Sequence, residues 1–415
     1  MKPLSLPLLT GYLLAMLGTG PHGHCQPAPR FIVDTPEGSH VDVAIQSLRP
    51  GGPLEWIQNG ERQASPQFLA FMQTGRKLPA LWPDSFVLLT NGDRIPLDPD
   101  AAVGLKDNRL RVWPTAALPG YQKDALSLFA PNVVMCFWSI PQGDDSAEKF
   151  FARVAREPRS RDVVYLRNGD RAVGTLGGID GKGCVLNQED RPLPIPWRLI
   201  AGIAWNTDRQ ARLRTKQTYY RAILAGGARV NFLDLQFDPK ARRWLGKTQF
   251  GAAVELPEPS LLALDCHQGP ALDLSDLKPA NFGARPYLGV SWPLAHDLTA
   301  DGHALRLVGN AFEKGLGTHA PCRVSYRLNK KFKRFDALVG IDAITSPRGR
   351  ARIALELDGK RIEVSAGTEL TAKAPPVEIR QNVAGIETLT LIVETGSFGD
   401  VQANVNWVKA RLVKK

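Results

Sequence analysis

The sequence predicts a mainly β protein in which small barrel-like or roll-like repeats, with one or two helices, precede a C-terminal β-sandwich. Three observations predict this class. Apolar and polar residues alternate in many short runs, as in strands with one buried face. Glycine-centred turns separate these runs. The 415 residues exceed one compact core, so we expect two or three domains.

The N-terminus resembles a secretory signal peptide over residues 1–25, because an apolar stretch runs from Leu4 to Leu17. Its apolar core is short for a bilayer span, and no later segment is apolar enough to cross one. We therefore expect export to the periplasm, the cell surface or the extracellular space, with no transmembrane segment. Lipidation of Cys25 is an alternative, although the preceding residues do not resemble a lipidation box.

An internal repeat organises the regions 30–160 and 161–275. Residues 87–94 match residues 164–171 in spacing and chemistry, and residues 223–230 are a degenerate third copy. Each copy predicts a hairpin, and in the first two an Asn-Gly pair predicts a two-residue turn, because both residues tolerate left-handed backbone. The repeat vaguely resembles Sm-like small barrels, which implies no function.

The repeat also supplies two aspartates, Asp93 and Asp170, each directly after a turn glycine. A glycosidase needs two carboxylates beside the bond it cleaves. We instead expect these aspartates to hydrogen-bond the turn backbone, which is the commoner role of aspartate at a turn.

Two helices are expected in the region 30–160. Near residues 145–157, Ser146 can cap the first turn, and Phe150 and Val154 fall on one face. Near residues 66–76, several apolar residues follow a proline, which predicts a second, short helix.

The region 287–415 predicts an all-β sandwich, after a linker at 276–286 where proline and glycine interrupt any period. Its apolar residues alternate with polar ones at strand period. The expected strands are 322–328, 334–341, 352–357, 389–394 and 405–413, with a turn at 358–359. A sandwich buries one face of each such strand.

The run 312–321, FEKGLGTHAP, predicts a glycine-punctuated turn that presents His319 at a loop edge. Together with VSYRL at 324–328, FDALVGID at 335–342, LDGK at 357–360 and Trp407, it resembles the NPCBM family of carbohydrate-binding modules. The resemblance covers residues 286–415. It implies a galactose-binding-like sandwich, or jelly roll, of a kind often appended to glycoside hydrolases and bacterial surface proteins, and glycan binding without bond cleavage.

Sugar sites combine an aromatic face with a few polar groups that bind hydroxyls. The candidates near the family motif are Trp292, Glu313, His319, Asp342, Asp400, Asn404 and Trp407. For four of them a structural alternative stays open: loop bonding for His319, an ion pair for Glu313, a core position for Trp407 and a turn acid for Asp342. Asp342 is also a candidate ligand of a structural calcium, and no other cofactor is expected.

The stretch 403–407, ANVNW, departs from the family pattern, in which acidic residues precede the last tryptophan. Asn404 and Asn406 stand at these positions. Amides still bind hydroxyl groups, so glycan binding remains expected, whereas strong calcium coordination is in doubt.

The net charge of +11 has two interpretations: a solvated basic surface, or attraction to an acidic polysaccharide. No nucleic-acid motif accompanies the basic clusters, so nucleic acid is not expected as a partner. No nucleophile elbow, zinc-protease motif or nucleotide fingerprint is present, so an enzyme is not expected. The alternatives are a structural or protein-interaction protein of the cell envelope, and an accessory part of a glycoside hydrolase system.

Four cysteines after the signal, Cys136, Cys184, Cys266 and Cys322, lack metal-site spacing. Export would permit disulfides, but buried small hydrophobes explain them equally well. The sequence does not indicate their pairing or the oligomeric state.

Overall fold

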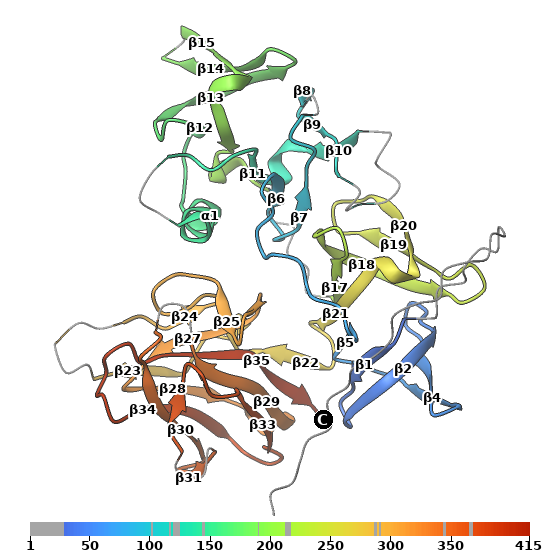
Figure 1. Cartoon of the computed structure of the whole chain (residues 1–415), viewed down its shortest axis with the longest axis vertical. Helices are drawn as coiled ribbons and strands as arrows, with labels where there is room; N and C mark the ends of the chain where they lie inside the picture. Colours follow the sequence, from blue (N-terminus) through green and yellow to red (C-terminus); the bar gives the residue numbers. More distant parts are fainter. Residues whose placement is uncertain are drawn as a thin grey trace, which may run out of the picture.

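The computed structural model describes residues 29–415, except 101–102, 116–117, 119–124, 143–145, 190, 212–216, 286–288, 290–291, 343–345 and 365–367. The expected signal peptide and Cys25 lie outside the described residues. The described part is mainly β, as predicted, and holds a single α-helix, α1 (Ala147–Arg156), shown in Figure 1. None of its helices is long and apolar enough to cross a membrane.

Residues 31–267 contain 21 strands joined by antiparallel pairings into one network. The first group is β1 (Phe31–Asp34), β2 (Ser39–Ser47), β3 (Leu54–Gln58), β4 (Glu61–Ser65) and β5 (Ala70–Gln73). The second is β6 (Phe86–Leu89), β7 (Arg94–Pro96), β8 (Gly104–Lys106), β9 (Arg109–Val112), β10 (Leu126–Phe129) and β11 (Val133–Phe137). The third is β12 (Asp162–Leu166), β13 (Arg171–Asp180), β14 (Gly183–Gln188), β15 (Arg191–Pro196) and β16 (Ile200–Ala204). The fourth is β17 (Tyr219–Leu224), β18 (Arg229–Asp238), β19 (Arg243–Thr248), β20 (Ala253–Pro257) and β21 (Leu261–His267).

Long-range pairings hold these groups together. Strand β5 pairs with both β1 and β21, and β11 pairs with both β6 and β16. One pair of facing residues, Arg94 and Arg229, joins β7 of the second group to β18 of the fourth. The buried faces of these strands form one large apolar core, and the barrel or roll shape of the repeats stays a prediction.

Helix α1 covers a separate aromatic cluster beside β6 and β11. The Ser146 hydroxyl caps its first turn by accepting a hydrogen bond from the Lys149 N–H. Its apolar face buries Phe150, Phe151 and Val154, and the Phe151 ring meets Phe86 edge to face at 5.0 Å. The structure thus has a helix where the sequence predicts one near 145–157.

The prediction of a helix near residues 66–76 is wrong, because strand β5 lies within this segment. The strand pairs on both sides, and Phe71 is buried while its neighbour Met72 is 37% exposed. The pairing on both sides makes this segment a strand, and its short run of apolar residues did not distinguish a strand from one helical turn.

The three repeat copies form the same hairpin loop. Leu89 accepts a hydrogen bond from the Gly92 N–H and donates its own N–H to the Asp93 carbonyl, each at 2.9 Å. Leu166 and Leu224 make the same pair of bonds in the second and third copies. The loop therefore has three residues, a type I turn followed by a glycine bulge.

The predicted two-residue Asn-Gly turn is consequently wrong. The glycines Gly92 and Gly169 are left-handed, with φ of 87° and 92°, but Asn91 is not among the described residues with positive φ. Asn91 is instead the second central residue of the type I turn, and its side-chain oxygen accepts the Asp93 N–H at 3.0 Å.

The C-terminal part is a sandwich of two six-stranded antiparallel sheets. The first sheet contains β22 (Ala271–Asp273), β24 (Ala295–His296), β27 (Gly315–His319), β29 (Phe332–Ile341), β33 (Val377–Asn382) and β35 (Asn404–Lys414). The second contains β23 (Asn281–Ala284), β28 (Cys322–Arg327), β30 (Arg350–Leu357), β31 (Lys360–Glu363), β32 (Leu370–Thr371) and β34 (Thr388–Thr395). A small hairpin of β25 (Leu305–Leu307) and β26 (Asn310–Phe312) adjoins them.

Two expectations about this part are corrected. The expected linker at 276–286 instead contains β23, which pairs with β28 across residues 281–284. The run 312–321, expected as a turn, contains β27 in the first sheet. A Cβ on Gly317 would lie 2.3 Å from the Leu298 carbonyl oxygen, so this glycine permits close packing rather than a turn.

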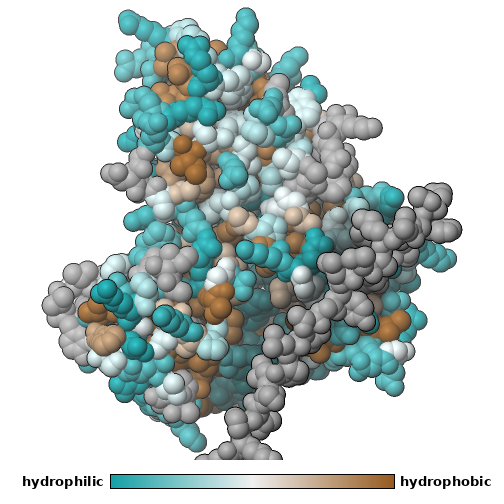
Figure 2. All heavy atoms as spheres, viewed as in Figure 1, coloured by the Kyte–Doolittle hydropathy of each residue, from teal (hydrophilic) through white to brown (hydrophobic). Residues whose placement is uncertain are grey.

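The sandwich packs directly against the N-terminal strands (Figure 1). Leu69, Ala271 and Val413 form a small apolar cluster across the junction. The Arg334 guanidinium donates to the Pro36 carbonyl at 2.7 Å. On the face seen in Figure 2, apolar residues are dispersed among polar ones, as is usual for a surface in contact with water.

The four described cysteines are free and buried. Burial raises the pKa of the Cys184 thiol to about 11 and that of the Cys322 thiol to about 12. They therefore behave as small core residues, which was one of the two interpretations left open by the sequence.

Candidate functional site

Two of the predicted sugar-binding residues, Trp292 and His319, lie together at one end of the sandwich. Their rings stack with centroids 5.2 Å apart and an interplanar angle of 19°. His319 is the last residue of β27 and sits opposite Asn404 of β35. Both stacked side chains are half-buried, so the pair presents an aromatic surface at the rim.

The His319 imidazole is biased toward its neutral form. Burial lowers its pKa, while a hydrogen bond with the Ala320 backbone and the carboxylates of Asp400 and Asp301 act in the opposite direction. A neutral imidazole has one donor and one acceptor nitrogen, which suits hydroxyl groups. Asp400, also a predicted residue, is half-buried in the loop between β34 and β35.

The same loop carries an aromatic residue that sequence reasoning missed. Phe398 is 56% exposed, and the Arg350 guanidinium lies over its ring at 5.2 Å from the centroid. A phenylalanine in the glycine-flanked stretch 396–399 is the signal that could have found it, because an apolar ring in such a loop has no strand face to bury it.

Three further predicted residues lie in the interior. Asp342, Asn404 and Trp407 are 1%, 5% and 0% exposed, respectively. The three side chains therefore occupy interior positions in this structure, and their part in sugar binding stays a prediction. For Trp407, the core position was the alternative stated from the strand pattern.

The buried amide of Asn406 explains part of the departure from the family pattern. Its Nδ2 lies 3.1 Å from the Arg306 carbonyl and 3.5 Å from an Asp342 carboxylate oxygen, and the residue is fully buried. An acid at this position would bury a second carboxylate beside Asp342, whereas the amide donates to it. In the described part of the chain, no three His, Cys, Asp or Glu side chains are grouped closely enough to hold a metal ion.

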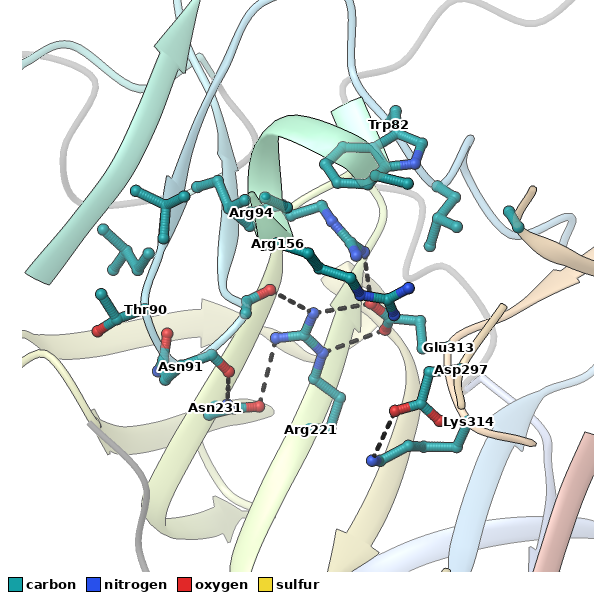
Figure 3. A pocket seen from close by; sticks show the side chains of 18 of the residues that line it. Trp82, Thr90, Asn91, Arg94, Arg156, Arg221, Asn231, Asp297, Glu313 and Lys314 are labelled. Atoms are coloured by element: carbon teal, nitrogen blue, oxygen red, sulfur yellow. Dashed lines mark hydrogen bonds and ion pairs between the residues drawn. The ribbon is translucent and has the colours of Figure 1, made fainter. Parts of the chain in front are cut away.

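Glu313 lies away from the rim, at the junction with the N-terminal strands (Figure 3). Its Oε1 accepts from Arg94 at 2.5 Å and from Arg221 at 2.8 Å, and its Oε2 lies 3.5 Å from Arg229. These arginines hold the pKa of Glu313 well below its ordinary value despite burial. The ion pair was the alternative proposed for this residue, and its partners come from the N-terminal region.

Asp93 completes this buried ion cluster. Its carboxylate is fully buried and accepts from Arg221 and from the Asn231 backbone N–H, each at 2.9 Å. Burial outweighs these contacts and raises the pKa of Asp93 to about 6. We name Arg94, Arg221, Arg229, Asp93 and Glu313 the junction cluster.

A pocket of about 310 Å³ opens beside the junction cluster (Figure 3). The N-terminal region contributes the β6–β7 hairpin, α1 and strands β17, β18 and β21, and the sandwich contributes residues from Asp297 to Lys314. Lys314 is held by Asp276 at 2.6 Å and Asp297 at 3.1 Å. None of the residues that line this pocket, apart from Glu313, was predicted from the sequence, because they come from segments far apart in the chain.

A family model, a curated relative and several solved structures match parts of this chain. A model of the NPCBM/NEW2 domain matches residues 272–413. A Renibacterium salmoninarum protein provisionally named endo-alpha-N-acetylgalactosaminidase is 26% identical over 113 residues, which are 27% of this chain and 7% of that protein's length.

Solved structures are also similar to parts of this chain. The CBM51 module of Clostridium perfringens GH95, in complex with methyl-galactose, is 22% identical, with a TM-score of 0.31, and the alignment covers 34% of this chain and 99% of the module. The CBM51-2 and INT domains of Clostridium perfringens ZmpB, in complex with GlcNAc, are 16% identical, with a TM-score of 0.32, over 44% of this chain and 43% of theirs. With its two antiparallel sheets and the family match, the segment 272–413 of this chain is an NPCBM/NEW2 domain.

Proposed function

We propose that this protein is an exported, non-catalytic glycan-binding protein that holds a sugar at the rim of its C-terminal sandwich. The observation that carries the proposal is the stack of Trp292 on His319. In this site the aromatic pair contacts the apolar face of a pyranose ring, and the imidazole and Asp400 bind its hydroxyl groups. The family match supports carbohydrate as the ligand class.

Phe398 extends the site as a second aromatic contact. It lies two residues before Asp400, and more than half of its side chain is exposed. The loop between β34 and β35 would then determine which sugars fit beside the Trp292–His319 stack. Export is supported by the apolar N-terminal stretch of the sequence.

A glycan array tests the proposal with the purified chain and its Trp292→Ala and His319→Ala variants. We expect both substitutions to abolish the binding signal while the circular dichroism spectrum and unfolding temperature stay near those of the parent. His40→Ala, in the N-terminal strand β2, is the matched control and should bind as the parent does. An array without signal for the parent protein would contradict glycan binding and favour a structural or protein-interaction role.

A further inference from the structure

The pocket at the junction has the composition of a second ligand site, separate from the rim. We propose that it binds a single saccharide unit that carries a carboxylate, that is, a hexuronic acid. The proposal is independent of the rim site, because no residue of the Trp292–His319 stack lines this pocket.

The pocket has the size and position expected of such a site. Its volume of about 310 Å³ is at the lower end of the range for small-molecule pockets, which favours one sugar ring over a chain. Its walls come from two parts of the molecule, and ligand pockets occur preferentially at such junctions.

Several polar groups in the walls remain available to hydroxyl groups. The Thr90 hydroxyl oxygen is buried and has no hydrogen-bond partner among the described residues. His267 directs its Nδ1 to Asp273 at 2.9 Å, which leaves the other ring nitrogen for a ligand. Tyr219 packs against the His267 ring at 5.2 Å and adds a phenol to the same wall.

Arg156 supplies the charge that favours an acid. Four basic residues line the pocket, Arg94, Arg156, Arg221 and Lys314, against the acids Glu313 and Asp297. Arg94 and Arg221 are paired with Glu313, and Lys314 is paired with Asp297 and Asp276.

Arg156 differs from the other three basic residues. Its guanidinium donates to the His296 carbonyl at 3.1 Å and forms no ion pair with a described residue, although the Asp297 carboxylate acts on it from a longer distance. Figure 3 draws it among the lining residues, next to Arg94 and Glu313 in this view. A planar guanidinium without an acid partner is well suited to a ligand carboxylate.

Titration calorimetry with the full chain tests the proposal, using galacturonic acid, galactose and acetate as probes. We expect galacturonic acid to bind and galactose to bind at least tenfold more weakly, because the neutral sugar lacks the charge-assisted contact to Arg156. Acetate should bind at least tenfold more weakly as well, because it lacks the hydroxyl groups.

Three variants assign the binding to this pocket. Arg156→Gln should weaken galacturonic acid at least tenfold, whereas Arg153→Gln, one turn earlier on α1 and outside the pocket lining, should leave the affinity unchanged. His319→Ala should also leave it unchanged, which separates this site from the rim. Absence of galacturonic acid binding at millimolar concentration, full binding by Arg156→Gln, or loss of binding in His319→Ala would each overturn the proposal.

Discussion

Two turns with the same sequence, Asn-Gly-Asp-Arg, have different roles in this molecule. Both adopt the same three-residue loop with a left-handed glycine. In the first copy, Asp93 is fully buried and Arg94 pairs with Glu313 of the sandwich. In the second, Asp170 and Arg171 are exposed, and the Asp170 carboxylate accepts a hydrogen bond from Asn168 at 2.7 Å.

The comparison separates what a local sequence determines from what its surroundings determine. The turn geometry depends on the left-handed glycine at its last position and is therefore repeated. The role of the acid depends on what packs against the turn: strand β18 and the sandwich cover the first copy, and the second copy faces water. At Asp170 the carboxylate bonds the Asn168 side chain rather than the expected turn backbone, whereas Asp93 is corrected to a member of the junction cluster.

The largest effect is expected from breaking the junction cluster at its centre. Glu313→Ala leaves Arg94, Arg221 and Arg229 without the carboxylate that they share, so the free energy of unfolding should fall by about 3–5 kcal/mol. Urea denaturation measures this change. Glu378→Ala, which removes an acid with a 63% exposed side chain paired with Arg380, is the control and should change it by less than about 0.5 kcal/mol. Equal losses of unfolding free energy in the two variants would show that the buried ion pairs of the junction cluster stabilise the fold no more than an exposed ion pair does.

The next largest effect concerns the pH dependence of Asp93. Burial raises its pKa from 3.8 to about 6, so the folded state binds its proton more tightly than the unfolded state. The resulting stabilisation is complete below pH 3.8 and is lost as the pH rises through about 6. This difference between the pKa of Asp93 in the folded and unfolded states corresponds to roughly 3 kcal/mol of unfolding free energy.

Asp93→Asn tests this sign, because the amide retains an acceptor for Arg221 and Asn231 but does not ionise. Between pH 4 and pH 7, the stability of the variant should rise relative to the parent by up to roughly 3 kcal/mol. Asp170→Asn serves as the second-copy control and should follow the parent curve. A constant difference between Asp93→Asn and the parent across this range would exclude a raised pKa.

Much of the fold could be predicted from the sequence because strand period and turn chemistry are local. The strands expected at 322–328, 334–341 and 389–394 correspond to β28, β29 and β34. The turn at Asp358-Gly359 is a two-residue turn with both residues left-handed, at φ of 48° and 84°. Shorter segments such as β5 and β23 were missed, because three or four residues do not reveal a period.

The site could be predicted only in part, since its geometry depends on contacts between distant segments. The ring pair of Trp292 and His319 was found through residue type and a family motif. The partner of Glu313 was not, because Arg94 lies 219 residues away along the chain. A single sequence carries no signal for a pairing at that distance, whereas the exposed Phe398 had one in its glycine-rich loop.

A smaller effect should distinguish the two turn glycines. Gly92→Ala and Gly169→Ala both place a side chain on left-handed backbone, which costs about 1–2 kcal/mol of folding free energy. A Cβ on Gly92 meets no atom within 4 Å, whereas on Gly169 it would lie 2.4 Å from the Gln142 carbonyl oxygen. Gly169→Ala should therefore be less stable than Gly92→Ala by a further 1–2 kcal/mol, roughly, in thermal or urea unfolding. The reverse order of stability would show that the backbone at Gln142 can move away from the new Cβ without loss of folding free energy.

The smallest effect is expected at the exposed acid of the second copy. Asp170→Ala removes one hydrogen bond to Asn168 at a site open to water, so the free energy of unfolding should change by less than about 0.5 kcal/mol. Asp93→Ala removes the partner of Arg221 and of the buried Asn231 N–H, and should cost about 1–3 kcal/mol more. Urea denaturation of both variants at pH 7 measures the difference. If Asp170→Ala were as costly as Asp93→Ala, the acid would act through the turn itself in both copies, and the surroundings would not account for their different roles.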